Sequence, residues 1–176
     1  MHLRPATLDD VPALAALGRA SFTDAFGHLY RSEDLAAFLA ETHDEAVVAG
    51  EIAGPQCRHL LALADNESLL GYCKLRYPSK LADLSAAASP LELSQLYCAA
   101  AATGRGVGGA LMDWALAEAK AGGHDAVVLS VYSENYGAQR FYQRYGFVKT
   151  ADTTFKVGAQ LDAEYLFEKP LSGEPA

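Results

Sequence analysis

Cysteine and closely spaced histidine are scarce in this chain. The 176 residues include three cysteines, Cys57, Cys73 and Cys98, which lie far apart and form no Cys-x-x-Cys pair. An odd number of cysteines without that spacing predicts neither a disulfide framework nor a zinc site. The five histidines also lack a ligand spacing such as His-x-x-x-His. We therefore expect no bound metal.

Surplus positive charge and long apolar stretches are absent as well. Acidic residues number 22 and basic residues 14, giving a net charge of -8, whereas a general nucleic-acid binder needs surplus cations for phosphate. No run of about 18 apolar residues predicts a membrane span, and no apolar segment near the N-terminus predicts a signal peptide. We expect a cytoplasmic protein without nucleic-acid or membrane partners. The negative charge is compatible with a cationic partner.

The length and composition are typical of one globular domain. Hydrophobic residues make up 51% of the chain and charged residues 20%, enough to form a substantial core. We see no internal repeat. We expect a single domain over residues 1–170 and a flexible tail over 171–176, where the sequence ends in SGEPA.

Hydrophobic periodicity predicts the order of the helices and strands. A short strand near residues 3–6 leads to a helix that Thr7 or Asp9 caps and that runs to about Ser21. Two further helices follow, the first capped by Ser32. The rest of the chain is predicted as strands at 59–65, 69–77, 91–99, 126–132, 147–155 and 163–171, and helices at 106–121 and 135–145.

This order predicts an α/β (α+β) fold. Hairpins occur beside strand-helix-strand units, so we expect a mixed, mostly antiparallel twisted sheet of about seven strands with helices on both faces.

A glycine-rich loop precedes the helix at 106–121. Four glycines fall within residues 104–109. A Walker P-loop is excluded because Ala110 follows the last glycine where lysine is required. A dinucleotide fingerprint matches by spacing, but residues 99–103 separate it from its strand, and the next strand does not end in the ribose-binding acid. A helix N-terminus that binds a pyrophosphate fits better. A tight turn without a ligand is the remaining alternative.

Two longer stretches resemble the GNAT superfamily of N-acetyltransferases. LELSQLYCAAAATGRGVGGALMDWALAEA is similar to its acetyl-CoA pyrophosphate motif, Gln/Arg-x-x-Gly-x-Gly/Ala, with Thr103 in the Gln/Arg place and Gly106 and Gly108 in the later places. LSVYSENYGAQRFYQRYGF is similar to the signature that ends in Tyr-x-x-x-Gly-Phe, here carried by Asn135, Ala138, Tyr142, Gly146 and Phe147. Within the superfamily, SFTDAFGHLYRSEDLAAFL and ELSQLYC are most similar to the PaiA-like polyamine acetyltransferases.

The resemblance implies acetyl-CoA as co-substrate and a set of residues that bind it. These are Leu96, Tyr97 and Cys98 on the strand, Thr103, Gly104, Arg105, Gly106, Val107, Gly108 and Gly109 in the loop and first helical turn, and Asn135 and Ala138 at the next helix. A backbone N–H near Cys98 is implied as the oxyanion donor. Thr103 departs from the motif, which removes one side-chain contact but leaves the backbone donors.

Two side chains are expected to move protons during direct acetyl transfer. The acceptor amine has a pKa of about 10 and must lose a proton before it attacks. We predict that Glu92 takes this proton, directly or through water. The resemblance implies that Tyr142 protonates the departing thiolate, although its spacing also fits packing beside Phe141 and Tyr145. A thiol nucleophile at Cys98 is disfavoured because no histidine is tied to it by sequence.

Three functions follow from these residues. The favoured one is an N-acetyltransferase for a primary amine, either a polyamine or another small amine. One alternative is a protein enzyme that acts on N-termini or lysines. Another is a non-catalytic acyl-CoA sensor, which Thr103 allows but Tyr142 and Glu92 disfavour. The acceptor is selected by the N-terminal helices and the 77–90 loop, where sequence rules are weakest. Both a monomer and a homodimer are compatible with the sequence.

Overall fold

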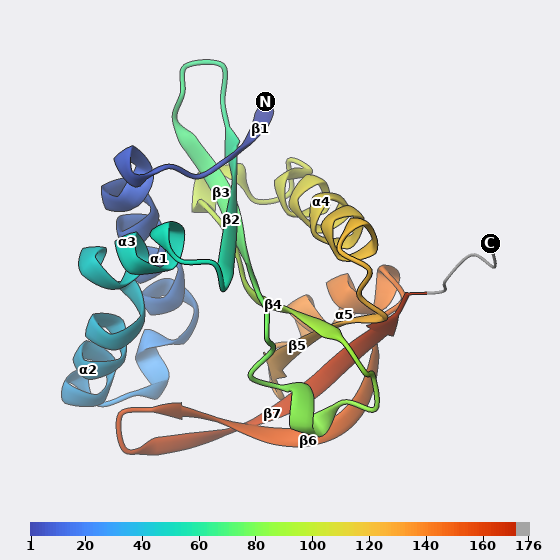
Figure 1. The fold of residues 1–176 in the computed structure, drawn as a ribbon. Coiled ribbons are helices and arrows are strands. Elements are labelled where there is room, and N and C mark those ends of the chain that lie inside the picture. Colours follow the sequence, from blue (N-terminus) through green and yellow to red (C-terminus); the bar gives the residue numbers. More distant parts are fainter. Residues whose placement is uncertain (172–176) are drawn as a thin grey trace.

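Seven strands form one sheet in the computed structural model, which describes residues 1–171 (Figure 1). They are β1 (His2–Pro5), β2 (Cys57–Leu63), β3 (Leu69–Arg76), β4 (Pro90–Cys98), β5 (Ala126–Tyr132), β6 (Val148–Val157) and β7 (Gln160–Pro170). Their spatial order is β1-β2-β3-β4-β5-β7-β6. β4 and β5 pair in parallel, and every other neighbouring pair is antiparallel. The predicted mixed, mostly antiparallel sheet is confirmed.

Helices cover both faces of the sheet, as predicted. They are α1 (Val11–Phe26), α2 (Ser32–His43), α3 (Glu45–Ala53), α4 (Val107–Ala121) and α5 (Tyr136–Arg144). The first three lie against one face, which we call the N-terminal face, and α4 and α5 lie against the other, the α4 face (Figure 1). Within the described chain, no helix has both the length and the apolarity to cross a bilayer.

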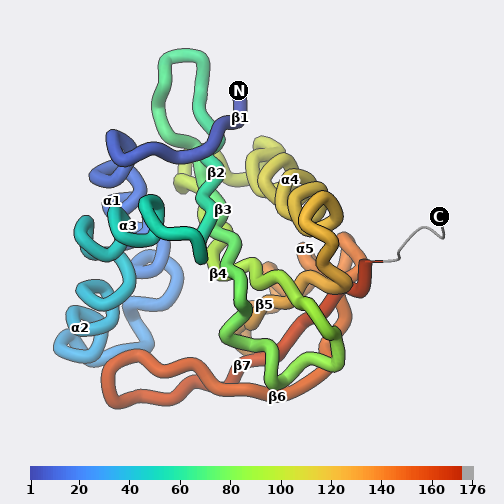
Figure 2. Tube along the Cα trace, viewed as in Figure 1, coloured from blue at the N-terminus to red at the C-terminus, as the bar shows by residue number. Residues whose placement is uncertain are grey.

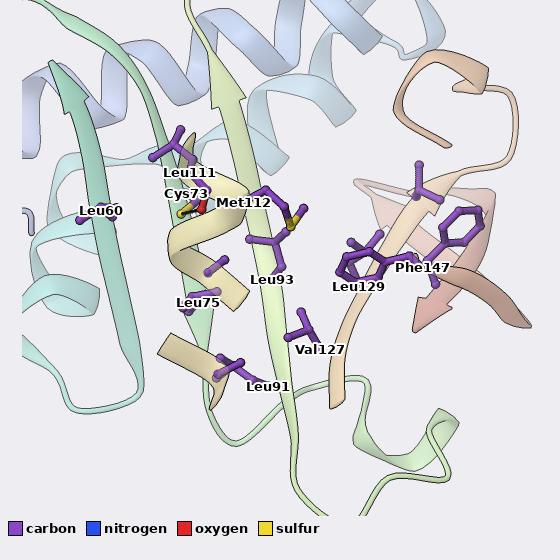
Figure 3. Packing of buried hydrophobic residues seen from close by; sticks show 14 of the residues in the cluster. Leu60, Cys73, Leu75, Leu91, Leu93, Leu111, Met112, Val127, Leu129 and Phe147 are labelled. Carbon is purple, nitrogen blue, oxygen red and sulfur yellow. Dashed lines mark hydrogen bonds between the residues drawn. The ribbon is translucent and has the colours of Figure 1, made fainter. Parts of the chain in front are cut away.

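The larger core holds α4 against the sheet. Leu111 and Met112 of α4 are fully buried and share one cluster with Cys73, Leu93 and Leu129 from β3, β4 and β5 (Figure 3). Because each buried Leu or Met stabilises the fold by about 1.5–3 kcal/mol, these contacts fix the start of α4 relative to the end of β4.

Asp10 places the start of the first helix later than predicted. Its carboxylate accepts hydrogen bonds from the Arg4 guanidinium (2.8 Å) and from the Thr7 N–H (2.7 Å). Residues Leu8–Asp10 therefore form a short 3-10 turn, which Thr7 caps in place of the helix. The helix α1 begins at Val11.

The end of α1 and the start of α2 also differ from the prediction. α1 continues past Ser21 to Phe26, because Phe22 is buried and packs on Phe38 of α2 with ring centroids 4.3 Å apart. Ser32 is the first residue of α2, and the capping position before it belongs to Arg31.

The C-terminal hairpin is longer than predicted. β6 and β7 leave a turn of only two residues at 158–159, and this tip lies beside α2 (Figure 2). The Ala159 N–H donates to Asp34 Oδ1 of α2 at 2.8 Å. The tail predicted over 171–176 lies outside the described residues apart from Leu171. That residue is buried, and its N–H donates to the Asp125 carbonyl at 2.8 Å, so it belongs to the folded chain.

Candidate active site

β4 and β5 separate after three paired positions. The pairs are Pro90 with Ala126, Leu91 with Val127, and Glu92 with Val128. Beyond them β4 pairs only with β3 and β5 only with β7. We call the unpaired region between residues 93–98 and 129–132 the β4–β5 gap. Backbone groups that face it have no ladder partner in the sheet, so a ligand can bind them.

The N–H of Cys98 faces this gap. Successive N–H groups of a strand point to opposite sides. The Ala99 N–H donates to the Leu70 carbonyl on β3 at 2.8 Å, so the preceding N–H, that of Cys98, points away from β3 and toward β5. This is the geometry that the predicted oxyanion donor requires.

The glycine loop presents further N–H groups at the start of α4. Gly104 and Gly106 have φ angles of +77° and +82°, the left-handed region that glycine adopts without strain. Gly106 is the N-cap of α4, so the N–H groups of Val107, Gly108 and Gly109 in the first turn have no partner within the helix. Together with the positive end of the helix dipole they form a binding site for an anion.

Thr103 and Arg105 flank these donors on the exposed side of the loop. Thr103 donates through Oγ1 to the Ala99 carbonyl at 3.4 Å. Among residues 1–171, no carboxylate lies within ion-pair distance of Arg105, which leaves its charge available to a phosphate. A 3-10 turn over Ala100–Ala102 separates this loop from β4. A dinucleotide fingerprint follows its strand directly, so this spacing supports the pyrophosphate interpretation.

The start of α4, the end of β4 and α5 meet at one point. A Cβ atom added to Gly108 would lie 3.7 Å from the Cys98 sulfur and 3.8 Å from the Phe141 ring. The predicted loop, strand and second motif are therefore brought together on the α4 face. Leu96 also packs on this side, whereas the Tyr97 ring points to the N-terminal face and lies 5.9 Å from the His43 ring.

Asn135 shapes the start of α5. Its side-chain oxygen accepts the Ala138 N–H at 3.1 Å, so Asn135 is an N-cap. Ala138 packs against the α4 core. One helical turn later Tyr142 packs in the same core, between Phe141 and Phe147.

Tyr142 lies beside the β4–β5 gap. Burial is the main cause that raises the pKa of its hydroxyl, and the nearby Cys98 thiol raises it next, followed by Cys73 and Glu164. A phenol with a raised pKa stays protonated at neutral pH and can act as a proton donor.

Glu92 lies at the closed end of the gap, on the N-terminal face. Its carboxylate is buried and accepts three hydrogen bonds, from the Lys80 N–H (2.7 Å), the Ser94 hydroxyl (2.6 Å) and the Ser79 hydroxyl (3.2 Å). Glu92 and Tyr142 therefore approach the gap from opposite faces of the sheet.

Four carboxylates lie on the N-terminal face, one on β4 at the gap and three on β7, the next strand beyond β5. They are Glu92 of β4 and Asp162, Glu164 and Glu168 of β7. The three on β7 alternate with Ala163, Tyr165 and Phe167, which point to the α4 face. Each accepts a hydrogen bond from an uncharged group, and none has a Lys, Arg or His side-chain nitrogen within 4.0 Å among the described residues.

Glu164 is the functional candidate that the sequence analysis missed. Its carboxylate accepts a hydrogen bond from the Ser130 hydroxyl on the neighbouring strand β5. Its Cα pairs with Tyr132 at the end of β5. Burial raises the pKa of Glu164 to about 6, which the Asp162 charge reinforces and the Ser130 hydrogen bond opposes. The available signal was the spacing of Asp162, Glu164 and Glu168, which places three acidic residues on one face of a strand, with Leu166 between the last two.

The site thus combines an anion-binding helix start, a backbone donor, a proton donor and unpaired carboxylates around one opening in the sheet. The first three lie at the gap or on the α4 face, and the carboxylates lie on the N-terminal face. This arrangement can hold an anionic acyl carrier on one side and a cationic acceptor on the other.

Comparisons with known proteins identify the family of this chain. Residues 19–147 match the acetyltransferase (GNAT) family. An uncharacterized N-acetyltransferase of Lactobacillus delbrueckii subsp. lactis is 28% identical over 162 residues, 92% of each chain. The PaiA N-acetyltransferase of Thermoplasma acidophilum, solved with coenzyme A, has a TM-score of 0.78 at 21% identity and covers 97% of this chain and 98% of that one.

A further structure, Arabidopsis thaliana NAA60 with acetyl-CoA, has a TM-score of 0.74 at 17% identity over 98% of this chain and 99% of that one. The family match spans well over half of the sequence and includes the loop, the gap strands and α5. The chain therefore belongs to the GNAT family of acetyltransferases and is an acetyl-CoA-dependent N-acetyltransferase.

Proposed function

We propose that this enzyme transfers the acetyl group of acetyl-CoA directly to a small primary amine, with polyamines as the favoured acceptor class. The observation that carries the proposal is the group of four carboxylates on the N-terminal face, three of them buried and Glu164 partly buried, none with a cationic partner among the described residues. Buried carboxylates without a cation are costly unless a ligand supplies one. An amine enters as an ammonium ion and supplies that charge.

The two ends of the β7 row suit an acceptor with more than one ammonium group. Asp162 accepts hydrogen bonds from the Tyr30 hydroxyl and from the Gln160 amide (2.7 Å). Glu164 lies two residues further along the same strand face, about 7 Å away at the spacing of a strand. An acceptor with two or more amines separated by short methylene chains would neutralise both.

We assign the remaining roles by the same geometry. The α4 start, with Arg105, binds the pyrophosphate, and the Cys98 N–H stabilises the oxyanion. Tyr142 gives its proton to the departing thiolate. For the proton acceptor the sequence predicts Glu92, and the structure offers Glu164 as a competing candidate. We further propose a cytoplasmic location, since all three cysteines are free thiols.

Calorimetric titration with acetyl-CoA is the first test, with NAD as the control ligand. We expect micromolar acetyl-CoA binding and none for NAD. An amine screen with spermidine, simple monoamines, free lysine and N-terminal peptides then ranks the acceptors by kcat/KM. Higher kcat/KM for peptides than for small amines would favour the protein enzyme, and binding without turnover on the whole screen would favour the sensor.

A further inference from the structure

Glu164 differs from the other carboxylates of the N-terminal face in its surroundings. Glu92 accepts three hydrogen bonds and Asp162 two, so protein donors already occupy much of their acceptor capacity. Glu164 and Glu168 each accept one, from Ser130 and Ser85. Of this second pair, Glu164 alone lies beside the β4–β5 gap. Glu168 lies beside the closed end, where its Cα pairs with Val128.

The gap brings Glu164 near the groups that act on the thioester. Its partner across the sheet, Ser130, lies in the stretch of β5 that has left β4. Burial is the main cause that raises the pKa of Tyr142, on the α4 face, and of Tyr97, on β4, and the Glu164 charge adds a smaller increase to both. It is therefore within electrostatic range of both borders of the gap.

Among residues 1–171, the titratable groups that face Glu164 are acids or phenols. Asp162 comes from its own strand, Tyr30 from the segment between α1 and α2, Tyr97 from β4, Tyr132 from β5 and Tyr142 from α5. β6 contributes only Thr153 opposite it. None of these groups supplies a positive charge, so an acceptor ammonium is the natural partner of this carboxylate.

We propose that the Glu164 carboxylate takes the proton of the acceptor ammonium, directly or through one water, before the amine attacks. The inference rests on the proposed function. The neutral nitrogen then forms the C–N bond and the C–S bond breaks. Of the two protons that the nitrogen loses, one passes through Glu164 to solvent. The other replaces the proton that Tyr142 gives to the departing sulfur.

The test is the pH profile of kcat/KM for wild type, Glu164→Gln, Glu92→Gln and the matched control Glu168→Gln. In wild type, kcat/KM falls about tenfold per pH unit below the pKa of the base, here about 6. In Glu164→Gln we expect kcat to fall about 10²–10⁴-fold and this acid limb to disappear, while acetyl-CoA affinity stays unchanged. Glu168→Gln removes a carboxylate of the same group at the closed end, so its KM can rise, but it keeps the acid limb. Partial recovery of kcat in Glu164→Asp would show that the carboxylate itself is required.

A readout independent of turnover is the titration of ¹³C-labelled glutamate carboxyls by NMR. A resonance with a pKa near 6 that is missing from Glu164→Gln supports the proposal, and an ordinary pKa at Glu164 contradicts it. Loss of the acid limb in Glu92→Gln, with the limb retained in Glu164→Gln, would overturn the inference and restore the sequence-based assignment. A wild type that acetylates no amine would refute the proposed function itself. An active wild type whose kcat and acid limb are unchanged in Glu164→Gln would refute only the role of Glu164.

Discussion

Tyr142 is the residue whose proposed role depends least on the acceptor. Its hydroxyl lies near Cys98, and burial keeps it protonated. We expect Tyr142→Phe to lower kcat by about 10²–10⁴-fold, the usual contribution of a general acid. The phenyl ring still packs with Phe141 and Phe147, so acetyl-CoA affinity should change little. Steady-state kinetics with calorimetry separates the two effects, and an unchanged kcat would show that Tyr142 serves only in packing.

Glu164 should also affect stability. Its pKa is about 6 in the folded protein against an ordinary value of 4.5. A carboxyl with a raised folded pKa destabilises the fold above that pKa, and the penalty disappears as pH falls below 4.5. The shift corresponds to about 2 kcal/mol. We expect Glu164→Gln to be more stable than wild type at pH 8 by up to this amount and equal at pH 4, measured by urea unfolding. Greater stability at both pH values would indicate another cause.

The residues that a motif carries could be predicted from sequence, and those that only the sheet brings together could not. Asn135 and Tyr142 lie in one contiguous signature, so their positions follow from spacing alone. Glu164 comes near the gap only because β7 inserts between β5 and β6. The hydrogen bond from Lys80 to Glu92 likewise depends on a loop whose path no sequence rule predicts.

At the scale of elements, the start of α4 can be tested with one matched pair of variants. A Cβ at Gly108 makes only ordinary contacts with Cys98 and Phe141, so Gly108→Ala should fold and bind acetyl-CoA nearly as well as wild type. In Gly108→Asp the added negative charge opposes the pyrophosphate, and about 1–4 kcal/mol of repulsion should weaken binding tenfold or more. The same charge stabilises a helix N-terminus, so loss of binding without loss of fold is expected. Unaltered affinity in calorimetry would show that the pyrophosphate lies elsewhere.

The contact of α1 with α2 and β3 depends on the absence of a side chain at Gly18. An added Cβ would lie 2.8 Å from both His43 Cε1 and the Tyr72 hydroxyl. We expect Gly18→Ala to destabilise the protein by about 1–3 kcal/mol, as overpacking does. Gly50 of α3 has open space around it, so Gly50→Ala should stabilise by up to about 1 kcal/mol. Chemical denaturation of both variants gives the sign of each change in the free energy of unfolding. Equal changes in the two variants would contradict this packing.

Element types were predictable, and element ends depended on contacts made elsewhere in the chain. The period of 3.6 identified α1, but its end at Phe26 depends on Phe38 of the next helix. The predicted helix at 106–121 needed a one-residue shift, because Gly106 adopts the left-handed cap conformation. The hairpin of β6 and β7 was predicted too short, since its tip is held by Asp34.

For the whole molecule, the mixed sheet and its two helical layers followed from the order of elements along the chain. The separation of β4 from β5 did not, because it reflects how two parallel strands diverge under the helices packed on each side. The two strands that separate form the only parallel pair of the described sheet. The local motifs before and after this point carry the family resemblance. That resemblance, and not the order of elements, implied an oxyanion donor near Cys98.

The opening between β4 and β5 also has a consequence for reaction order. In the proposed arrangement the acyl donor is held from one side of the sheet and the nucleophile arrives from the other, so neither has to leave before its partner enters. Both must be bound at the same time for the acetyl group to move directly from the donor to the acceptor. Initial-rate measurements should therefore give double-reciprocal lines that intersect, and parallel lines would indicate an acetylated enzyme, with Cys98 as the first residue to examine.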